Sequence, residues 1–193
     1  MKKALFLALL LPLVSFGQKF EVREQAGYSI AADNLNDILN SDNRIKGFSN
    51  RVDLGYSFTK NLSAHAFYEY DKWNTHSYTF GVSPEYAFGH FYVGADLKLI
   101  KFRDYYADWA AADIRYKESL GYGFHIGSRQ KLFKGLSLTE ELGYGKITVK
   151  GSEYFPYGNP YAQPYYIQSA PTTETFTGHV QYGYLRAGLS YRF

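Results

Sequence analysis

Apolar and polar residues alternate with a period of two along most of this chain. In the stretch FSNRVDLGYSF, residues 48–58, aromatic and aliphatic side chains share one face, and polar side chains or glycine share the other. Alternation of this kind predicts a β-strand with one apolar face. The pattern predicts eight strands, at about residues 20–30, 48–58, 62–70, 78–88, 91–99, 114–126, 136–144 and 185–193.

The segments between these strands alternate in length. Short connections fall at residues 60–61, 89–90 and 129–135, and long ones fall at 31–47, 71–77, 101–113 and 150–176. Because strands joined by short turns are antiparallel, this order predicts an up-and-down meander with all its long loops at one rim.

Glycine indicates which face of the strands points inward. A soluble lipid-binding barrel would show the same alternation with its apolar face inside. However, glycine weakens a strand facing solvent, whereas the narrow interior of an eight-stranded barrel needs small residues. Nine glycines fall on the polar face: Gly55, Gly81, Gly94, Gly121, Gly123, Gly127, Gly143, Gly145 and Gly188. We therefore expect an all-β, eight-stranded antiparallel up-and-down transmembrane β-barrel with its apolar face in lipid.

Aromatic residues gather toward both ends of the predicted strands. Such girdles flank the lipid-facing band of transmembrane β-barrels. The short-turn end has Phe58, Phe88, Phe91, Phe124, Tyr191 and Phe193, and the long-loop end has Phe48, Tyr68, Tyr70, Tyr78, Tyr116 and Tyr144.

The N-terminus has the pattern of a secretory signal peptide. Lys2 and Lys3 precede an apolar run, and small residues end at Gly17. The run is too short for a membrane anchor. The sequence therefore predicts a cleaved signal peptide at residues 1–17 and one outer-membrane barrel domain at residues 18–193.

The mature chain is nearly neutral. Removing Lys2 and Lys3 from the 21 Lys and Arg residues leaves 19, against 18 Asp and Glu. This balance argues against a nucleic-acid partner. The absence of Cys excludes a disulfide scaffold. The five His residues are scattered without ligand spacing, so we expect no metal site and no cofactor.

The C-terminal segment YLRAGLSYRF ends an amphipathic strand on an aromatic residue. Its apolar row includes Leu185, Leu189, Tyr191 and Phe193. In these features the chain resembles the small eight-stranded outer-membrane barrels of Gram-negative bacteria. The resemblance implies that the barrel lies in outer-membrane lipid, and that the barrel-assembly machinery reads this last strand as its signal. The predicted cleavage just before Gln18 also resembles exported proteins of the Bacteroidota.

The predicted inward face carries charged residues of both signs in nearly equal number. Buried unpaired charges are costly, so we expect an ion-paired polar plug. There are two alternatives. The charges could line an ion path, which would make the protein a minor narrow channel, or they could form a proton-dependent site. The residues are Arg51, Asp53, His65, Glu69, Glu85, Asp96, Lys98, Arg115, Lys117, His125, Glu141 and Arg186.

Enzymatic activity is a second alternative. Some small outer-membrane barrels modify lipid A with His and Ser near the outer leaflet, and such residues must lie together. His76 and Ser77 are adjacent here, but no longer motif accompanies them. We therefore assign no catalytic residues and expect a non-enzyme.

Two long loops are rich in aromatic residues. The Pro-Tyr near-repeat places Tyr157, Tyr161 and Tyr165 at four-residue intervals, and residues 101–113 hold Tyr105, Tyr106 and Trp109. These loops could recognise a protein or glycan, or could form a stiff lid over the mouth. The predicted function is a surface barrel for membrane integrity, adhesion or recognition.

Three carboxylates interrupt the predicted lipid-facing rows. Glu24 and Glu140 lie within strands, and Glu118 lies nearer the long-loop rim. A β-bulge or a misplaced strand end would account for them, and a protein contact within the membrane is the alternative.

Overall fold

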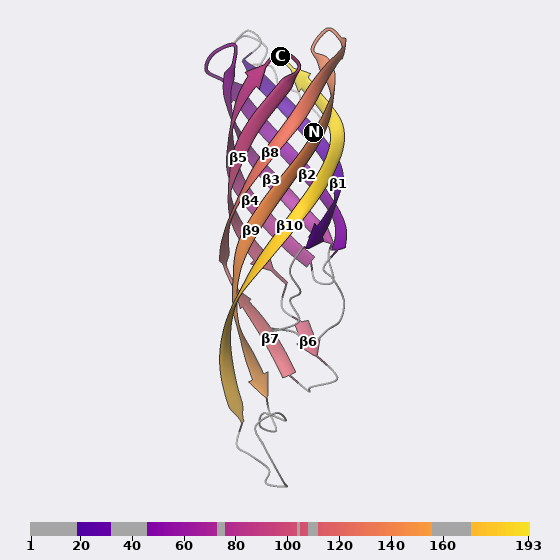
Figure 1. Ribbon diagram of the computed structural model, residues 1–193. Coiled ribbons are helices and arrows are strands. Elements are labelled where there is room, and N and C mark those ends of the chain that lie inside the picture. The colour runs from indigo at the N-terminus through magenta and orange to yellow at the C-terminus, as the bar shows by residue number, and fades with distance from the viewer. Residues whose placement is uncertain (1–18, 32–45, 73–75, 104, 108–111, 156–170) are drawn as a thin grey trace, which may run out of the picture.

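Figure 1 shows the computed structural model, in which eight long antiparallel strands close into a barrel. The structure describes residues 19–31, 46–72, 76–103, 105–107, 112–155 and 171–193. The barrel strands are β1 (Phe20–Ala31), β2 (Lys46–Ser57), β3 (Leu62–Lys72), β4 (His76–Phe88), β5 (Phe91–Phe102), β8 (Ser119–Phe133), β9 (Leu136–Phe155) and β10 (Thr172–Arg192). Each strand pairs with the next in this order, and β10 returns to pair with β1. The predicted fold is therefore confirmed.

The two faces of the wall differ as the alternation predicted. On β8, Leu120 and Phe124 expose 72% and 61% of their surface, whereas His125 exposes 5%. The exposed row is aromatic and aliphatic around the barrel, and such a surface is stable in lipid but not in water. The charged row lies inside.

Two of the three short turns depend on glycine. Gly89 joins β4 to β5 with φ of 66°, and Gly135 joins β8 to β9 with φ of 80°. Residues with a side chain rarely adopt this left-handed conformation. These turns lie at the same end of the barrel as the C-terminus (Figure 1).

The long-loop end contains more strand than the sequence predicted. β9 and β10 run for 20 and 21 residues, so the expected loop at 150–176 is in part a paired hairpin. The expected loop at 101–113 contains β6 (Tyr105–Ala107) and the start of β7 (Ala112–Lys117). β6 pairs with β7, and β7 pairs with the far end of β9. Together they form a sheet beyond the barrel (Figure 1).

The predicted strand at 114–126 is broken at Glu118. Lys117 pairs with Lys150, whereas Gly121 pairs with Ile147. Four residues on one side therefore match three on β9, and a one-residue shift turns every side chain to the opposite face. The β-bulge proposed for Glu118 accounts for this shift.

The reversal at Glu118 corrects three sequence predictions. Arg115 and Lys117 are exposed rather than inside the lumen. Tyr116 turns inward, where its ring lies 5.3 Å from that of Phe102 and 6.0 Å from that of Phe176.

The first and last strands tie the chain ends together. Val22 pairs with Tyr191, and the Phe193 N–H donates to the Phe20 carbonyl at 2.9 Å. The predicted signal peptide, residues 1–17, lies outside the described residues. No helix in the described part of the chain is long and apolar enough to cross a membrane.

Candidate functional site

The barrel interior gathers charged residues from all eight strands. Ten of the twelve residues predicted for the lumen are buried there: Arg51, Asp53, His65, Glu69, Glu85, Asp96, Lys98, His125, Glu141 and Arg186. The other two, Arg115 and Lys117, lie on β7 outside the barrel.

β1 contributes interior residues that the sequence reading missed. Glu21, Arg23 and Gln25 are buried with 3%, 0% and 1% exposure. The alternation in residues 20–30 is less regular than in the other strands, so the sequence predicted no lumen residue there. The pairing of Gly27 with Arg186 would have identified the row, but that pairing is a property of the closed barrel.

Arg23 is the central cation near the short-turn end. Its Nη1 and Nη2 donate to Glu85 Oε1 and Oε2 at 2.8 and 2.9 Å. This bidentate geometry is the strongest kind of Arg–carboxylate pair. Glu21 closes the same end, because Arg129 and Arg192 donate to it at 2.9 and 2.8 Å.

A second set of ion pairs lies further along the barrel. Arg51 donates to Asp53 at 2.7 and 2.9 Å and to Asp96 at 3.1 Å. Its guanidinium also lies over the Phe67 ring at 3.8 Å. Arg186 donates to Glu69 and, at 3.3 Å, to Glu141. These groups occupy the space through which an ion would have to pass.

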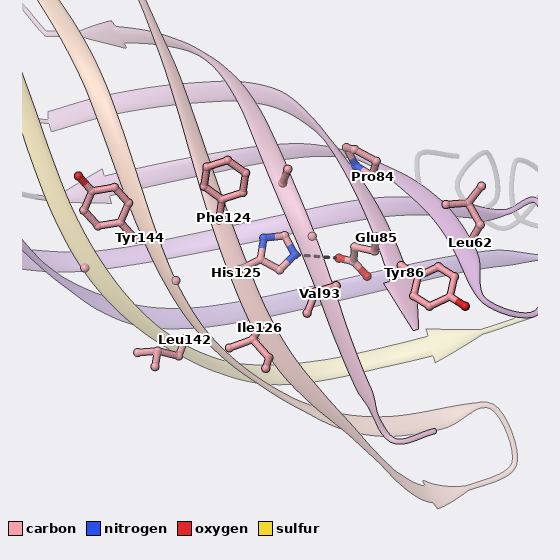
Figure 2. A pocket seen from close by; sticks show the side chains of 14 residues that line it. Leu62, Pro84, Glu85, Tyr86, Val93, Phe124, His125, Ile126, Leu142 and Tyr144 are labelled. Atoms are coloured by element: carbon pink, nitrogen blue, oxygen red, sulfur yellow. Dashed lines mark ion pairs between the residues drawn. The ribbon is translucent and has the colours of Figure 1, made fainter. Parts of the chain in front are cut away.

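His125 lies among three carboxylates. Its Nδ1 is 3.6 Å from Asp96 Oδ1, and its Nε2 is 3.6 Å from Glu85 Oε1 and 3.9 Å from Glu141 Oε2. Figure 2 shows the His125–Glu85 pair as a dashed line. Glu85, His125 and Glu141 place ligand atoms within 4.8 Å of one another. A metal ion there would compete with Arg23 and Arg186, so the geometry favours ion pairing over metal binding.

An apolar cluster follows the charges toward the long-loop end. Beyond Lys98 on β5 come Ile100 and Phe102, and beyond Gly145 on β9 come Ile147 and Val149. The cluster comprises Ala31, Ile100, Phe102, Ile147, Val149, Val180, Tyr182 and Tyr184, with Tyr116 and Phe176 packed against it. Lys98 Nζ donates to the Tyr182 hydroxyl at 3.0 Å, so the ion pairs and the apolar cluster are in direct contact.

The sequence analysis did not predict the apolar residues of this cluster as interior residues. They continue the inward row of each strand, so their parity could have identified them. They carry no charge, so the pattern of inward charged residues did not indicate them.

A shallow groove of about 800 Å³ runs along the outer wall over the Glu85–His125 pair (Figure 2). Its lining includes lipid-facing residues such as Tyr86, Phe124 and Leu142, together with Gly94 and Gly143. The groove is therefore part of the apolar surface that lipid covers.

His76 and Ser77 do not form a catalytic pair. Ser77 is fully buried, and its Oγ donates to Asp71 Oδ2 at 3.2 Å. His76 points to the other face, where its ring stacks on Tyr70 with centroids 5.7 Å apart. Adjacent residues of a strand point to opposite faces, so the geometry opposes the lipid A-modifying alternative at these residues.

The outward carboxylates lie in regularly paired strand. Glu24 pairs with Leu189, and Glu140 pairs with Ala187, without a register shift on either side. A bulge therefore does not account for them. Ser128 Oγ donates to Glu140 Oε2 at 3.2 Å, which partly satisfies that carboxylate.

Four of the six predicted recognition residues lie outside the described part of the chain. The other two, Tyr105 and Tyr106, lie in strand β6. Trp109, Tyr157, Tyr161 and Tyr165 lie outside the described residues.

Comparison with known proteins supports the fold alone. No protein-family model and no curated protein matches the chain. Among solved structures, it is similar to Neisserial surface protein A, with TM-score 0.61, 22% identity and coverage of 90% of this chain and 97% of that one. It is also similar to outer membrane protein AlkL, with TM-score 0.54, 16% identity and coverage of 91% and 90%. A third is OprG from Pseudomonas aeruginosa, with TM-score 0.52, 13% identity and coverage of 91% and 96%.

The closed barrel and its apolar exterior define the class of this protein. It has the fold of the small eight-stranded outer-membrane β-barrels. Because an exterior of this kind requires a lipid bilayer and such barrels span bacterial outer membranes, the outer membrane is its location. The neighbours whose source is named give no support to an origin in the Bacteroidota.

Proposed function

We propose that this protein is a non-enzymatic outer-membrane barrel that acts through its extracellular surface, in membrane integrity, adhesion or recognition. The observation that carries the proposal is the filled interior. Ion pairs occupy one part of the lumen and the apolar cluster occupies the next. A filled interior of this kind supports a structural role for the lumen, and the functional contacts are then made by the extracellular surface.

The loops are the candidate surface. An even number of strands puts both termini at one rim, which we take to be periplasmic. β6, β7 and the far ends of β9 and β10 then lie outside the cell. The Pro-Tyr segment joins β9 to β10, and binding residues are often found on loops held by a rigid scaffold. Protein and glycan are the partners that Tyr and Trp side chains favour.

A conductance measurement tests the closed lumen. Purified protein in planar bilayers should give no steady current, because ions would have to displace Arg23–Glu85 and Arg51–Asp96 pairs and cross apolar residues. Reproducible open-channel steps would contradict the proposal and favour the minor-channel alternative.

A pull-down from native outer membranes tests the recognition role. A variant with Tyr157, Tyr161 and Tyr165 all changed to Ser should lose the partners that the unaltered protein captures. If the variant captures the same partners as the unaltered protein, these tyrosines do not bind them, and the lid alternative is favoured.

A further inference from the structure

The rim at the short-turn end carries a set of lysines that the interior does not use. Lys19 precedes β1, Lys60 lies in the β2–β3 turn, and Lys131 and Lys134 lie at the tip of the β8–β9 hairpin. All four are exposed, and in the described part of the chain none belongs to an ion pair. We call these four residues the lysine rim.

Negative charge is scarce at the same end. The rim is formed by residues 19–22, 57–62, 87–92, 129–137 and 190–193, in which Glu21 supplies the one acidic side chain. Glu21 is 3% exposed and is engaged by Arg129 and Arg192. The exposed charged side chains of this rim are therefore basic, although the mature chain is nearly neutral.

Backbone hydrogen bonds place the lysine rim along one arc. The Ser57 N–H donates to the Lys19 carbonyl at 2.8 Å, which holds Lys19 beside the end of β2. The Arg192 N–H donates to the Gly135 carbonyl at 2.8 Å, which holds the β8–β9 tip beside β10. The arc thus runs from the β8–β9 tip over β10 and β1 to the β2–β3 turn.

Exposed apolar side chains accompany the lysines. Leu132 and Phe133, which are 53% and 63% exposed, lie between Lys131 and Lys134, and Phe58 is 58% exposed near Lys60. The pairing of β8 with β5 ends at Ser128, so the β8–β9 tip projects past its neighbour. An apolar side chain beside an ammonium group suits the boundary between acyl chains and headgroups.

We propose that the lysine rim binds the phosphate groups of anionic phospholipids in the periplasmic leaflet. This inference rests on the orientation proposed above. Basic groups at a membrane surface are attracted to anionic lipid, and the neighbouring Leu132, Phe133 and Phe58 would be covered by the same leaflet. Peptidoglycan carboxylates would match the charge but would leave those three side chains in water.

Lipid selectivity tests this proposal. The full mature chain is reconstituted in nanodiscs of equal phosphatidylcholine and phosphatidylglycerol, and retained lipids are counted by native mass spectrometry. We expect phosphatidylglycerol to be retained about threefold or more over phosphatidylcholine. Changing Lys19, Lys60, Lys131 and Lys134 to Gln should bring the ratio close to one.

The opposite rim provides a matched control. Changing the exposed Lys72, Lys101, Lys117 and Lys150 to Gln removes the same charge and should leave the preference unchanged. Equal retention of both lipids by the unaltered protein, or a preference that survives in the lysine-rim variant, would overturn the proposal. So would binding to purified peptidoglycan without lipid preference. The nanodisc result does not depend on orientation in the cell, so its failure is distinct from failure of the proposed surface function.

Discussion

Large interior side chains of this barrel face a glycine on the neighbouring strand. Tyr184 pairs directly with Gly143 and Tyr182 with Gly145, and a Cβ on either glycine would overlap the tyrosine ring. The same arrangement joins Phe67 to Gly81, Tyr92 to Gly127, His65 to Gly55 and His125 to Gly94. The glycines therefore provide the space in which the rings lie against the wall.

The Gly143→Ala variant tests this packing. The added methyl group would overlap the Tyr184 ring, and overpacking a core costs about 1–3 kcal/mol. We expect a loss of this size in the free energy of unfolding, measured by urea titration in lipid vesicles. Gly183→Ala is the control, because its nearest outside atom lies 3.9 Å away. Equal losses in the two variants would show that ring packing is not the cause.

The sheet beyond the barrel places like charges side by side. Glu153 on β9 pairs directly with Glu174 on β10. Partial burial, reinforced by the Glu174 carboxylate, raises the pKa of Glu153 above its usual value. The protonated form is therefore favoured in the folded hairpin. Protonated Glu153 therefore adds to the free energy of unfolding at pH below the pKa that Glu153 has in the unfolded chain. This contribution is lost as the pH rises through the higher pKa that Glu153 has in the folded hairpin.

Glu153→Gln should remove this dependence. At neutral pH the variant should slow hydrogen exchange in residues 150–155 and 172–178, because two adjacent carboxylates become one. The difference from the unaltered protein should shrink as pH falls toward the usual Glu range, near 4. Glu140→Gln, on the outer wall, should leave this exchange unchanged. Faster exchange at neutral pH in Glu153→Gln would contradict the account.

Barrel closure depends on pairing between the two ends of the chain. β10 pairs with β1 over residues 182–192, and Phe193 donates its N–H to Phe20. On β10 the row of Leu185, Leu189 and Tyr191 is exposed on the lipid-facing side of the barrel. The role of this strand as an assembly signal remains a proposal.

Deleting Phe193 separates assembly from stability. It removes one terminal hydrogen bond and one ring, whose centroid lies 5.0 Å from that of Tyr191. We expect refolding in detergent to be largely retained, while the yield in cellular outer membranes falls several-fold. Similar losses in both assays would mean that Phe193 contributes only packing.

The orientation of the barrel predicts an accessible loop. Residues 156–170 connect strands that extend beyond the barrel at the end opposite the C-terminus (Figure 1). An epitope tag replacing residues 158–163 should be reached by antibody on intact cells and should leave the barrel folded. An inaccessible tag on a folded barrel would show that the orientation is inverted, and with it the assignment of the lysine rim to the periplasmic leaflet.

Local alternation was sufficient to predict the strands and the face on which most residues lie. Successive side chains of a strand point to opposite faces, so the lipid-facing Leu120 and the interior His125 could be assigned locally. Glycine in the polar row was sufficient to show which face is inside. The lipid-embedded class of the protein followed from these local features.

Which residues contact one another across the lumen depends on the closed barrel and not on local sequence. Arg23 and Glu85 are 62 residues apart in sequence, and their contact depends on the register of every strand between them. The one-residue shift at Glu118 turned the side chains of Arg115 and Lys117 to the face opposite the predicted one. Pairing with β9 made strand of residues that the sequence predicted as loop. Alternation repeats every two residues and therefore cannot distinguish one register from another shifted by two. Closure of β10 onto β1 fixes that choice, and with it the partner of each buried charge.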